Sequence, residues 1–144
     1  MSKAEIMDWV PGSHASTFGG NPVCIAAALA TMNVIEREGL QNAAVVGSAM
    51  IERLRGWIAK HPTVGDVRGR GLMIGVEMVK DQQSRQPVGA MRDRIVELAF
   101  ERGLLLLGCG ETSIRLCPPL IVKQQEADVA LDILEECVVL AARG

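Results

Sequence analysis

The chain has few aromatic residues, no tyrosine, and no strong excess of charge of either sign. Only 3% of its 144 residues are aromatic, so a ring-shaped ligand would need its stacking surface from elsewhere. The 15 basic and 17 acidic residues leave a net charge of −2, and the basic residues are scattered. A nucleic-acid-binding surface needs a clustered basic excess, so the composition argues against nucleic-acid binding.

Metal-binding, secretory and membrane-spanning patterns are also missing. The four cysteines form no Cys-x-x-Cys pair and no Cys/His cluster, so we expect no metal site. Nothing suggests a secreted disulfide framework, and we predict reduced thiols in a cytoplasmic protein. Cys24 and Cys137 fall on apolar helix faces, where a free thiol is usually a small core residue. No signal peptide is visible, and the longest apolar run, residues 23–32, is too short to span a bilayer.

Apolar residues are abundant. They make up 49% of the chain, which excludes disorder and suffices for one buried core. Hydrophobic periodicity predicts helices over residues 22–38, 40–60, 88–103 and 124–141. Alternation and turn residues predict strands over residues 64–68, 72–79, 104–107 and 113–117. This order predicts an α+β fold, in which a small antiparallel sheet is covered on one face by helices.

Several local features refine this arrangement. The first predicted helix is apolar nearly all round, so we expect it to be buried on more than one side. Gly39 is its predicted C-cap. Residues 104–107 are all leucine, which predicts an interior strand of the sheet. Lys123 stands where the last helix needs an N-cap, and it is a poorer cap than serine or threonine.

The domain organisation follows from these features. Residues 1–21 are predicted to form a loop or leader, and residues 22–38 a helix that links to a larger domain absent from this chain. Residues 39–144 are predicted to form a small domain with its own core.

Residues 16–22, with the sequence Ser-Thr-Phe-Gly-Gly-Asn-Pro, are the most informative stretch. The glycines let the backbone pass close to another group. Asn21 and Pro22 are typical of a helix start. Hydroxyls beside free N–H groups can bind an anion such as a phosphate. An ordinary turn before a helix is at least as good an interpretation on these local grounds.

Arg115 is the most notable single side chain. In a strand with aliphatic neighbours directed at the helices, it points to the opposite face, toward a possible cleft. A guanidinium there suits a carboxylate, which it binds through two parallel hydrogen bonds. From the alternation alone, a plain surface arginine is the favoured interpretation. The glycine turn at residues 69–71 is predicted to be a tight connection between two strands. Its edges carry the charged residues Arg68, Arg70 and Glu77.

Four stretches of the sequence carry a family resemblance. They are residues 14–30, beginning His-Ala-Ser-Thr-Phe-Gly-Gly-Asn-Pro; residues 66–77, Asp-Val-Arg-Gly-Arg-Gly-Leu-Met-Ile-Gly-Val-Glu; residues 102–107, Arg-Gly-Leu-Leu-Leu-Leu; and residues 114–120, Ile-Arg-Leu-Cys-Pro-Pro-Leu. In this order they resemble segments of the class III aminotransferases, pyridoxal-phosphate (PLP) enzymes that include 4-aminobutyrate, acetylornithine and ornithine aminotransferases. These enzymes are about three times as long. The resemblance implies their C-terminal portion, the C-terminal domain of a fold-type I PLP-dependent transferase.

The resemblance also implies roles for particular residues. The arginine at the position of Arg115 binds the substrate's α-carboxylate in this family. The threonine at the position of Thr17, with Ser16 as a secondary contact, binds the cofactor phosphate of the other subunit of a homodimer. His14 precedes them and is expected to be structural. The full-length parent would use PLP to move an amino group from an amino acid or ω-amine to a 2-oxo acid.

No residue of this chain is expected to be catalytic. Lys3, Lys60, Lys80 and Lys123 all lack a context that would desolvate an amine. The resemblance places the Schiff-base lysine upstream, in the absent part, so the isolated chain is not expected to catalyse transamination. Two alternatives stay open: a stand-alone ligand-binding or regulatory module for a carboxylate metabolite, and a structural dimerisation fragment.

Overall fold

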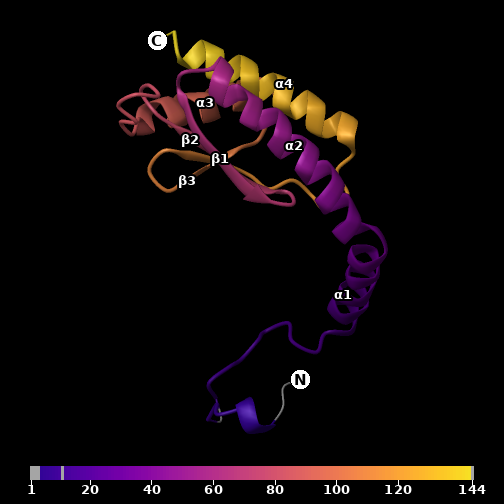
Figure 1. The fold of residues 1–144 in the computed structure, drawn as a ribbon. Coiled ribbons are helices and arrows are strands. Elements are labelled where there is room, and N and C mark those ends of the chain that lie inside the picture. Colours follow the sequence, from indigo (N-terminus) through magenta and orange to yellow (C-terminus); the bar gives the residue numbers. More distant parts are fainter. Residues whose placement is uncertain (1–3, 11, 144) are drawn as a thin grey trace. The chain divides into compact units, whose positions relative to one another are not determined.

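The computed structural model describes residues 4–10 and 12–143, which form two compact units. The first unit extends to Val34 and contains a short 3-10 turn, Ala4–Ile6, and helix α1, Pro22–Val34. The second begins with one turn of π-helix, Ile35–Gly39, and holds the other helices and the sheet (Figure 1). None of the helices in the described part of the chain has both the length and the hydropathy that crossing a bilayer requires.

The second unit is an α+β layer, as the sequence predicts. Its helices are α2 (Leu40–Lys60), α3 (Gly89–Glu101) and α4 (Gln124–Ala141). Its strands are β1 (Val64–Arg70), β2 (Met73–Met78), β3 (Leu107–Cys109) and β4 (Ser113–Leu116). The strands form one antiparallel sheet in the order β1-β2-β4-β3. All three helices cover the same face of this sheet (Figure 1).

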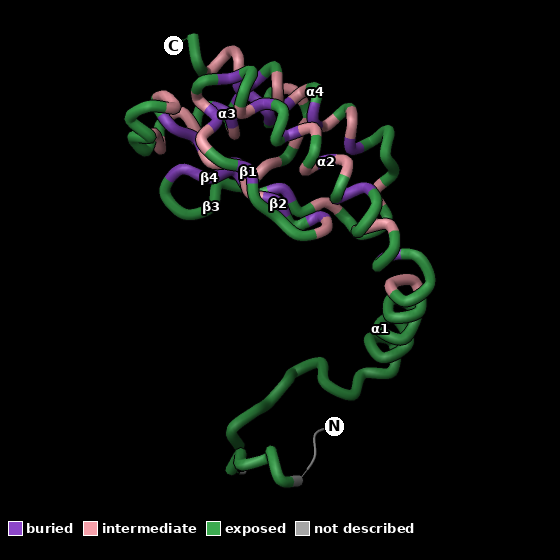
Figure 2. The backbone as a smooth tube through the Cα atoms, viewed as in Figure 1, coloured by how far each residue is buried: buried purple, intermediate pink, exposed green. Residues whose placement is uncertain are grey.

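The core lies between this sheet and the three helices (Figure 2). Leu54 of α2, Ile95 of α3 and Leu134 of α4 are each fully buried there. In β2 the even-numbered residues Ile74, Val76 and Met78 are buried, as the predicted alternation requires. None of the described helices of the second unit covers the opposite face of the sheet, which we call the helix-free face.

Residues 104–107 do not form the predicted interior strand. The strand is Leu107–Cys109, and it lies at the edge of the sheet with all three residues exposed. Leu104 and Leu106 still pack against the core, but from an extended connection after α3. An apolar run of this length suits a buried connection as well as a central strand, and periodicity cannot separate the two.

Gly39 is not the predicted C-cap. Its φ of −62° and ψ of −43° are right-handed helical values, whereas a glycine C-cap adopts a positive φ. The α-helical hydrogen bonding ends at Val34, and residues 35–39 form a π-turn instead of a break. Gly39 is buried in this turn, which accounts for a small residue there without a chain reversal.

Helix α1 begins as predicted, at Pro22. The Asn21 side-chain oxygen accepts hydrogen bonds from the backbone N–H groups of Val23 at 3.0 Å and Cys24 at 3.2 Å, so Asn21 is the N-cap. None of the residues of α1 is buried in this chain, and Cys24 is exposed instead of being a core residue. The buried Cys137 in α4 does match its prediction.

Helix α2 approaches the turn between β1 and β2 very closely at Gly47. A Cβ atom on Gly47 would lie 2.2 Å from the backbone carbonyl of Gly71, which no side chain can tolerate. Gly71 itself has a φ of +56° and makes the turn. This contact sets the distance between α2 and the sheet.

Candidate functional site

The helix-free face of the sheet carries a row of residues on three neighbouring strands. Arg68 in β1 pairs with Gly75 in β2, and Gly75 pairs with Arg115 in β4. Since paired strands lie about 4.8 Å apart, the two arginine Cα atoms are about 10 Å apart. Gly75 has no side chain, so the space between the two arginines stays open. A hollow of about 630 Å³ lies there, and it is also lined by Arg70 and Cys109.

Arg68 is held by acidic groups on this face. Its guanidinium donates to the Glu77 carboxylate at 2.9 Å, to Asp66 at 3.0 Å and to the Ser113 hydroxyl at 3.1 Å. Glu77 pairs with Asp66 on one side and with Ser113 on the other, in the row next to that of Gly75. The Arg68 guanidinium is therefore directed toward Glu77, while the base of the side chain stays beside Gly75, with its Cγ 3.9 Å from where a Cβ on Gly75 would lie.

Glu77 is itself firmly anchored. Its carboxylate accepts a hydrogen bond from Ser113 at 2.5 Å and another from the Thr112 hydroxyl. Partial burial alone would raise the pKa of Glu77, but the hydrogen bonds from Ser113, Thr112 and Arg68 outweigh it and lower that pKa below its usual value. The bonds to Glu77 and then Asp66 raise the pKa of Arg68. This ion pair is charged across the whole physiological range.

Arg115 differs from Arg68. It is exposed on β4 between the buried residues Ile114 and Leu116, as the alternation predicts. None of the described residues places a carboxylate within hydrogen-bond or ion-pair distance of its guanidinium. Arg115 therefore carries a positive charge on the open sheet face without an acidic partner in this part of the chain.

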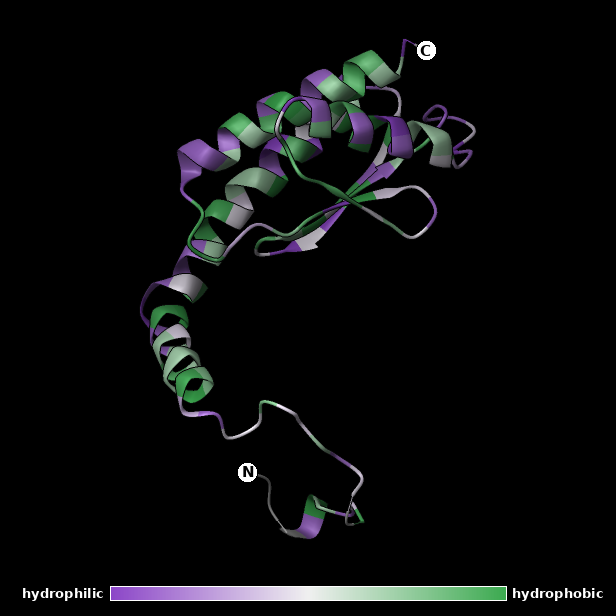
Figure 3. Ribbon diagram, turned by 180° about the vertical axis from the view of Figure 1, so that it is seen from behind, coloured by the Kyte–Doolittle hydropathy of each residue, from purple (hydrophilic) through white to green (hydrophobic). Residues whose placement is uncertain are grey.

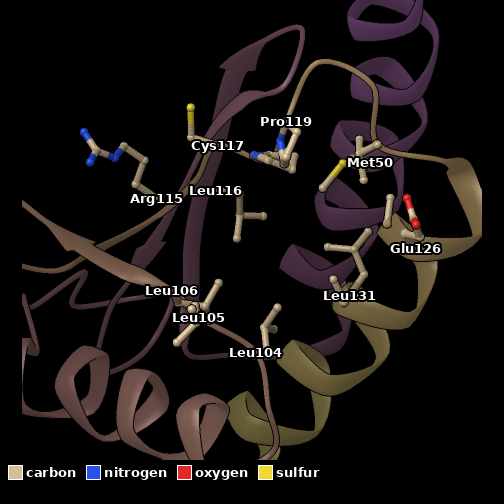
Figure 4. Close-up of a pocket in the computed structure, with 14 residues that line it drawn as sticks. Met50, Leu104, Leu105, Leu106, Arg115, Leu116, Cys117, Pro119, Glu126 and Leu131 are labelled. Carbon is tan, nitrogen blue, oxygen red and sulfur yellow. The ribbon is translucent and has the colours of Figure 1, made fainter.

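An apolar pocket of about 300 Å³ lies on the other side of Arg115, between β4, the 104–106 connection and the helices α2 and α4. Leu104 and Leu131 face into this pocket, and the Glu126 carboxylate lies at its rim (Figure 4). The Arg115 guanidinium points away from all three of these residues in the same view. The charged group therefore belongs to the sheet face, and only the base of its side chain borders the apolar pocket.

Ser16 and Thr17 belong to the first unit, in the segment before α1. Both are exposed, and no hydrogen bond of either hydroxyl occurs among the described residues. The backbone turns here, with the N–H of Gly19 donating to the carbonyl of Ser16 at 3.4 Å. A Cβ atom on Gly19 would lie 3.0 Å from the Ser16 Cβ, so glycine keeps this turn tight. His14 packs against the Trp9 ring at a centroid distance of 5.5 Å.

The lysines offer no buried amine in the described part of the chain. Lys60, Lys80 and Lys123 are exposed, and Lys3 lies outside the described residues. Lys60 donates to the Glu135 carboxylate at 2.6 Å. Lys123 precedes α4 without a side-chain cap, as predicted, and the Glu126 carboxylate accepts its backbone N–H at 2.8 Å.

Comparison with known proteins places the chain in a family. The family model described as aminotransferase class-III matches residues 1–138. The chain belongs to the class III aminotransferase family. This family is PLP-dependent.

Individual relatives differ in activity. The chain is 34% identical to the isoleucine 2-epimerase of Lentilactobacillus buchneri, over all of this chain and 32% of that protein. It is 39% identical to the 5-aminovalerate aminotransferase DavT of Pseudomonas aeruginosa, over 94% of this chain and 33% of that protein. The chain thus spans about a third of the length of the curated relatives it matches.

The fold agrees with solved structures of the same family. The PLP-bound crystal structure of an amine transaminase from an uncultivated Pseudomonas species superimposes with a TM-score of 0.80 and 36% identity. The match covers 91% of this chain and 30% of that one. The α+β unit therefore corresponds to part of a transaminase fold.

Sequence reasoning missed the network around Glu77. Thr112 lies in the turn before β4 and Ser113 is the first residue of β4, both far from Arg68 in the sequence, and no motif links them. The one signal was that Arg68 and Glu77 flank the same turn, which suits a cross-strand ion pair. Only the register of β2 on β4 brings Ser113 beside Glu77.

Proposed function

We propose that this chain is the C-terminal segment of a PLP-dependent enzyme that moves an amino group between an amino acid or ω-amine and a 2-oxo acid. Family membership supports the cofactor class and the reaction class. The isolated chain is not catalytic in this proposal, because none of its described lysines is buried or desolvated. The complete enzyme is a cytoplasmic homodimer, and 4-aminobutyrate-like ω-amines are among its substrates.

The observation that carries the proposal is the exposed guanidinium of Arg115 on the helix-free sheet face. It stands beside Gly75, next to an open hollow, and no acidic group of the described residues neutralises it. A bidentate contact from such a group binds a carboxylate and also fixes its orientation. Arg115 is therefore the residue that holds the substrate carboxylate, which leaves the substrate's amine free to meet the cofactor.

The described residues fit one end of the cofactor. The exposed hydroxyl of Thr17, with Ser16 beside it, makes no hydrogen bond among the described residues and can donate to a phosphate oxygen. The N–H groups of Val23 and Cys24 are taken by Asn21 and are not free for the phosphate. Thr17 and Ser16 would hold the phosphate of the partner subunit's cofactor. When bound, PLP supplies the electron sink for the carbanion chemistry.

A second candidate reaction is racemisation or epimerisation of an amino acid. It is favoured by the relatives named isoleucine 2-epimerase and alanine/serine racemase, which are 34% and 42% identical to the chain. Both reactions require a held carboxylate and the same cofactor. Formation of a 2-oxo acid from an L-amino acid indicates transamination, and formation of the opposite configuration at the α-carbon without a 2-oxo acid indicates the alternative.

The test is Arg115→Ala in the full-length enzyme. Loss of a desolvated charged contact costs about 2–5 kcal/mol, so kcat/KM for a carboxylate substrate should fall by at least about 30-fold. An amine without a carboxylate should be affected far less in its own half-reaction. Equal losses for both kinds of substrate would mean that Arg115 is structural, and the carboxylate role would be abandoned.

A further inference from the structure

Two guanidiniums flank the same open space, but only that of Arg115 has no carboxylate partner among the described residues and can bind an anion there. Arg68 and Arg115 stand on either side of Gly75, with their Cα atoms about 10 Å apart. Both side chains are long and flexible enough to meet above a residue that has no side chain. A carboxylate placed there would meet two positive charges if nothing restrained Arg68.

Glu77 supplies the restraint. Its carboxylate accepts from Arg68 at 2.9 Å, in the neighbouring row of the sheet, where Ser113 also accepts from Arg68 at 3.1 Å. Glu77 is in turn bonded by Ser113 at 2.5 Å and by Thr112. Because three strands and a turn share these bonds, Glu77 cannot swing toward Gly75 together with Arg68.

The carboxylates on this face lie beside Arg68 and not beside Arg115. Arg68 has two carboxylates, Glu77 and Asp66, within 3.0 Å. Arg115 has none among the described residues, although it lies on the same face of the same sheet. The contrast arises from the register, which pairs Glu77 with Asp66 and Ser113 and pairs Gly75 with the two arginines.

We propose that Glu77 is a positioning residue of the carboxylate site: it holds Arg68 aside and neutralises it, so that a substrate carboxylate meets Arg115 alone. This rests on the proposed role of Arg115. When Glu77 loses its charge, Arg68 is released from this ion pair and can bind the carboxylate in place of Arg115. Gly75 provides the space into which either arginine can reach, so a larger residue there would separate them.

The test uses an unreactive probe, butanoate, whose dissociation constant for the full-length, PLP-loaded enzyme is measured by calorimetry. Butanamide, which lacks the charge, is the control ligand. Arg115→Ala should weaken butanoate binding at least tenfold and leave butanamide binding nearly unchanged. The fold-increase in the butanoate dissociation constant caused by Arg115→Ala should be at least three times smaller in the Glu77→Gln background than in the wild type. The reason is that Arg68 then reaches the carboxylate.

Two further variants assign this rescue. Adding Arg68→Gln to the Glu77→Gln/Arg115→Ala double variant should abolish it. Glu135→Gln, which neutralises an ion-paired carboxylate of α4 outside the sheet face, should produce no rescue. If Glu77→Gln fails to fold, Asp66→Asn replaces it, because Asp66 is an exposed partner of Arg68 and should give a smaller rescue in the same direction.

The outcomes separate the two proposals. A rescue that depends on Arg68 supports the positioning role of Glu77. A large loss from Arg115→Ala with no rescue by Glu77→Gln or Asp66→Asn overturns that role and leaves Arg115 as the carboxylate-binding residue. If Arg115→Ala does not weaken butanoate binding at all, the proposed role of Arg115 is wrong, and the role of Glu77 falls with it.

Discussion

Helices α1 and α2 lie close together in the sequence and distribute their apolar residues in different ways. In α1, apolar residues occur around the whole helix (Figure 3), and those such as Val23 and Leu29 are 77% and 58% exposed in this chain. In α2, apolar residues form one stripe, and Leu54 and Trp57 on that stripe are almost completely buried. The exposed positions of α2 carry mostly polar or small residues, with Leu40 and Val45 as exposed apolar exceptions.

This difference shows which helix can bury its apolar surface by packing within this chain. The stripe of α2 needs one partner layer, and the sheet of the same unit supplies it. A helix that is apolar on every side needs cover on several sides, and the described residues do not provide it. We therefore interpret α1 as the element that the remaining two thirds of the family's length would cover, which is the link toward a larger domain proposed from the sequence.

The largest expected effect comes from comparing the same type of substitution, leucine to alanine, in α2 and in α1. Leu54→Ala should destabilise the chain by about 2–5 kcal/mol, because it leaves a cavity in a close-packed core. Leu29→Ala should change the stability by less than about 0.5 kcal/mol, because this side chain is exposed. Urea unfolding of the two variants measures both values. A loss at Leu29 as large as that at Leu54 would show that α1 is buried in solution and would remove the contrast.

A second prediction sharpens the packing side of the comparison. Gly47→Ala should destabilise the chain by about 2–3 kcal/mol, because its Cβ would clash with the Gly71 backbone and push α2 from the sheet. Gly56→Ala is the matched control on the same helix, with open space around it. That control should stabilise the chain by up to about 1 kcal/mol. Equal unfolding midpoints for the two variants would mean that α2 lies further from the turn.

A third prediction concerns acid stability in the second unit. Glu135 accepts from Lys60 at 2.6 Å and contacts the His61 ring nitrogen at 2.9 Å. Burial alone would raise the pKa of Glu135, but the bonds from Lys60 and His61 outweigh it and lower that pKa. The stabilisation is thus present above the unfolded-state pKa of about 4.3, and it is lost as pH falls through the lower folded-state pKa.

Glu135→Gln should therefore cost about 1 kcal/mol at neutral pH and flatten the stability curve below about pH 4.5. Urea unfolding at a series of pH values provides the measurement. Glu136→Gln is the control, since this neighbouring carboxylate is exposed and lies 3.5 Å from Arg102. An identical fall in the free energy of unfolding below about pH 4.5 for the wild type and Glu135→Gln would contradict the prediction.

The smallest effect on stability is expected in the first unit, at Thr17. Thr17→Val should leave the free energy of unfolding within about 0.5 kcal/mol, because the residue is exposed. In the full-length enzyme it should raise the dissociation constant of PLP about tenfold, since valine keeps the shape but removes one hydrogen bond to the phosphate. Cofactor titration by absorbance checks this value.

Mixed dimers test whether Thr17 acts across the subunit interface. One subunit carries Thr17→Val and keeps the cofactor-binding lysine, and the other has an intact Thr17 and lacks that lysine. The only lysine-bearing site is then completed by the intact threonine of the other subunit, so its PLP affinity should equal that of the wild type. Affinity as weak as in the Thr17→Val homodimer would place the threonine contact within its own subunit.

Much of the second unit could be predicted because its patterns are local. The predicted ranges 40–60 and 124–141 are the observed bounds of α2 and α4, since each helix has an apolar stripe and a clear end. The α3 prediction was two residues too long at its C-terminal end and began one residue early. Alternation also predicted that Arg115 faces away from the helices.

The errors arose where a local pattern suits two structures. Four leucines at 104–107 fit a central strand, yet most of them form a connection, and the strand that follows lies at the sheet edge. Gly39 fits a helix stop, yet it adopts helical dihedral angles in a π-turn. At 104–107 the packing of Leu104 and Leu106 against the core decided the outcome, and at Gly39 the helix continued through a π-turn in which this glycine is buried. No local propensity reports either result.

The sequence alone determined the fold class, the limits of α2 and α4, the family resemblance and the orientation of Arg115, because these depend on periodicity and on short motifs. The tertiary structure decided how Glu77 restrains Arg68 and how Gly75 opens the space beside Arg115. Those relations depend on the register of three strands, one of which, β4, lies far from β1 and β2 in the chain. A shift of one residue in that register would turn the paired side chains to the opposite face of the sheet, so the charge pattern exists only once the sheet has formed.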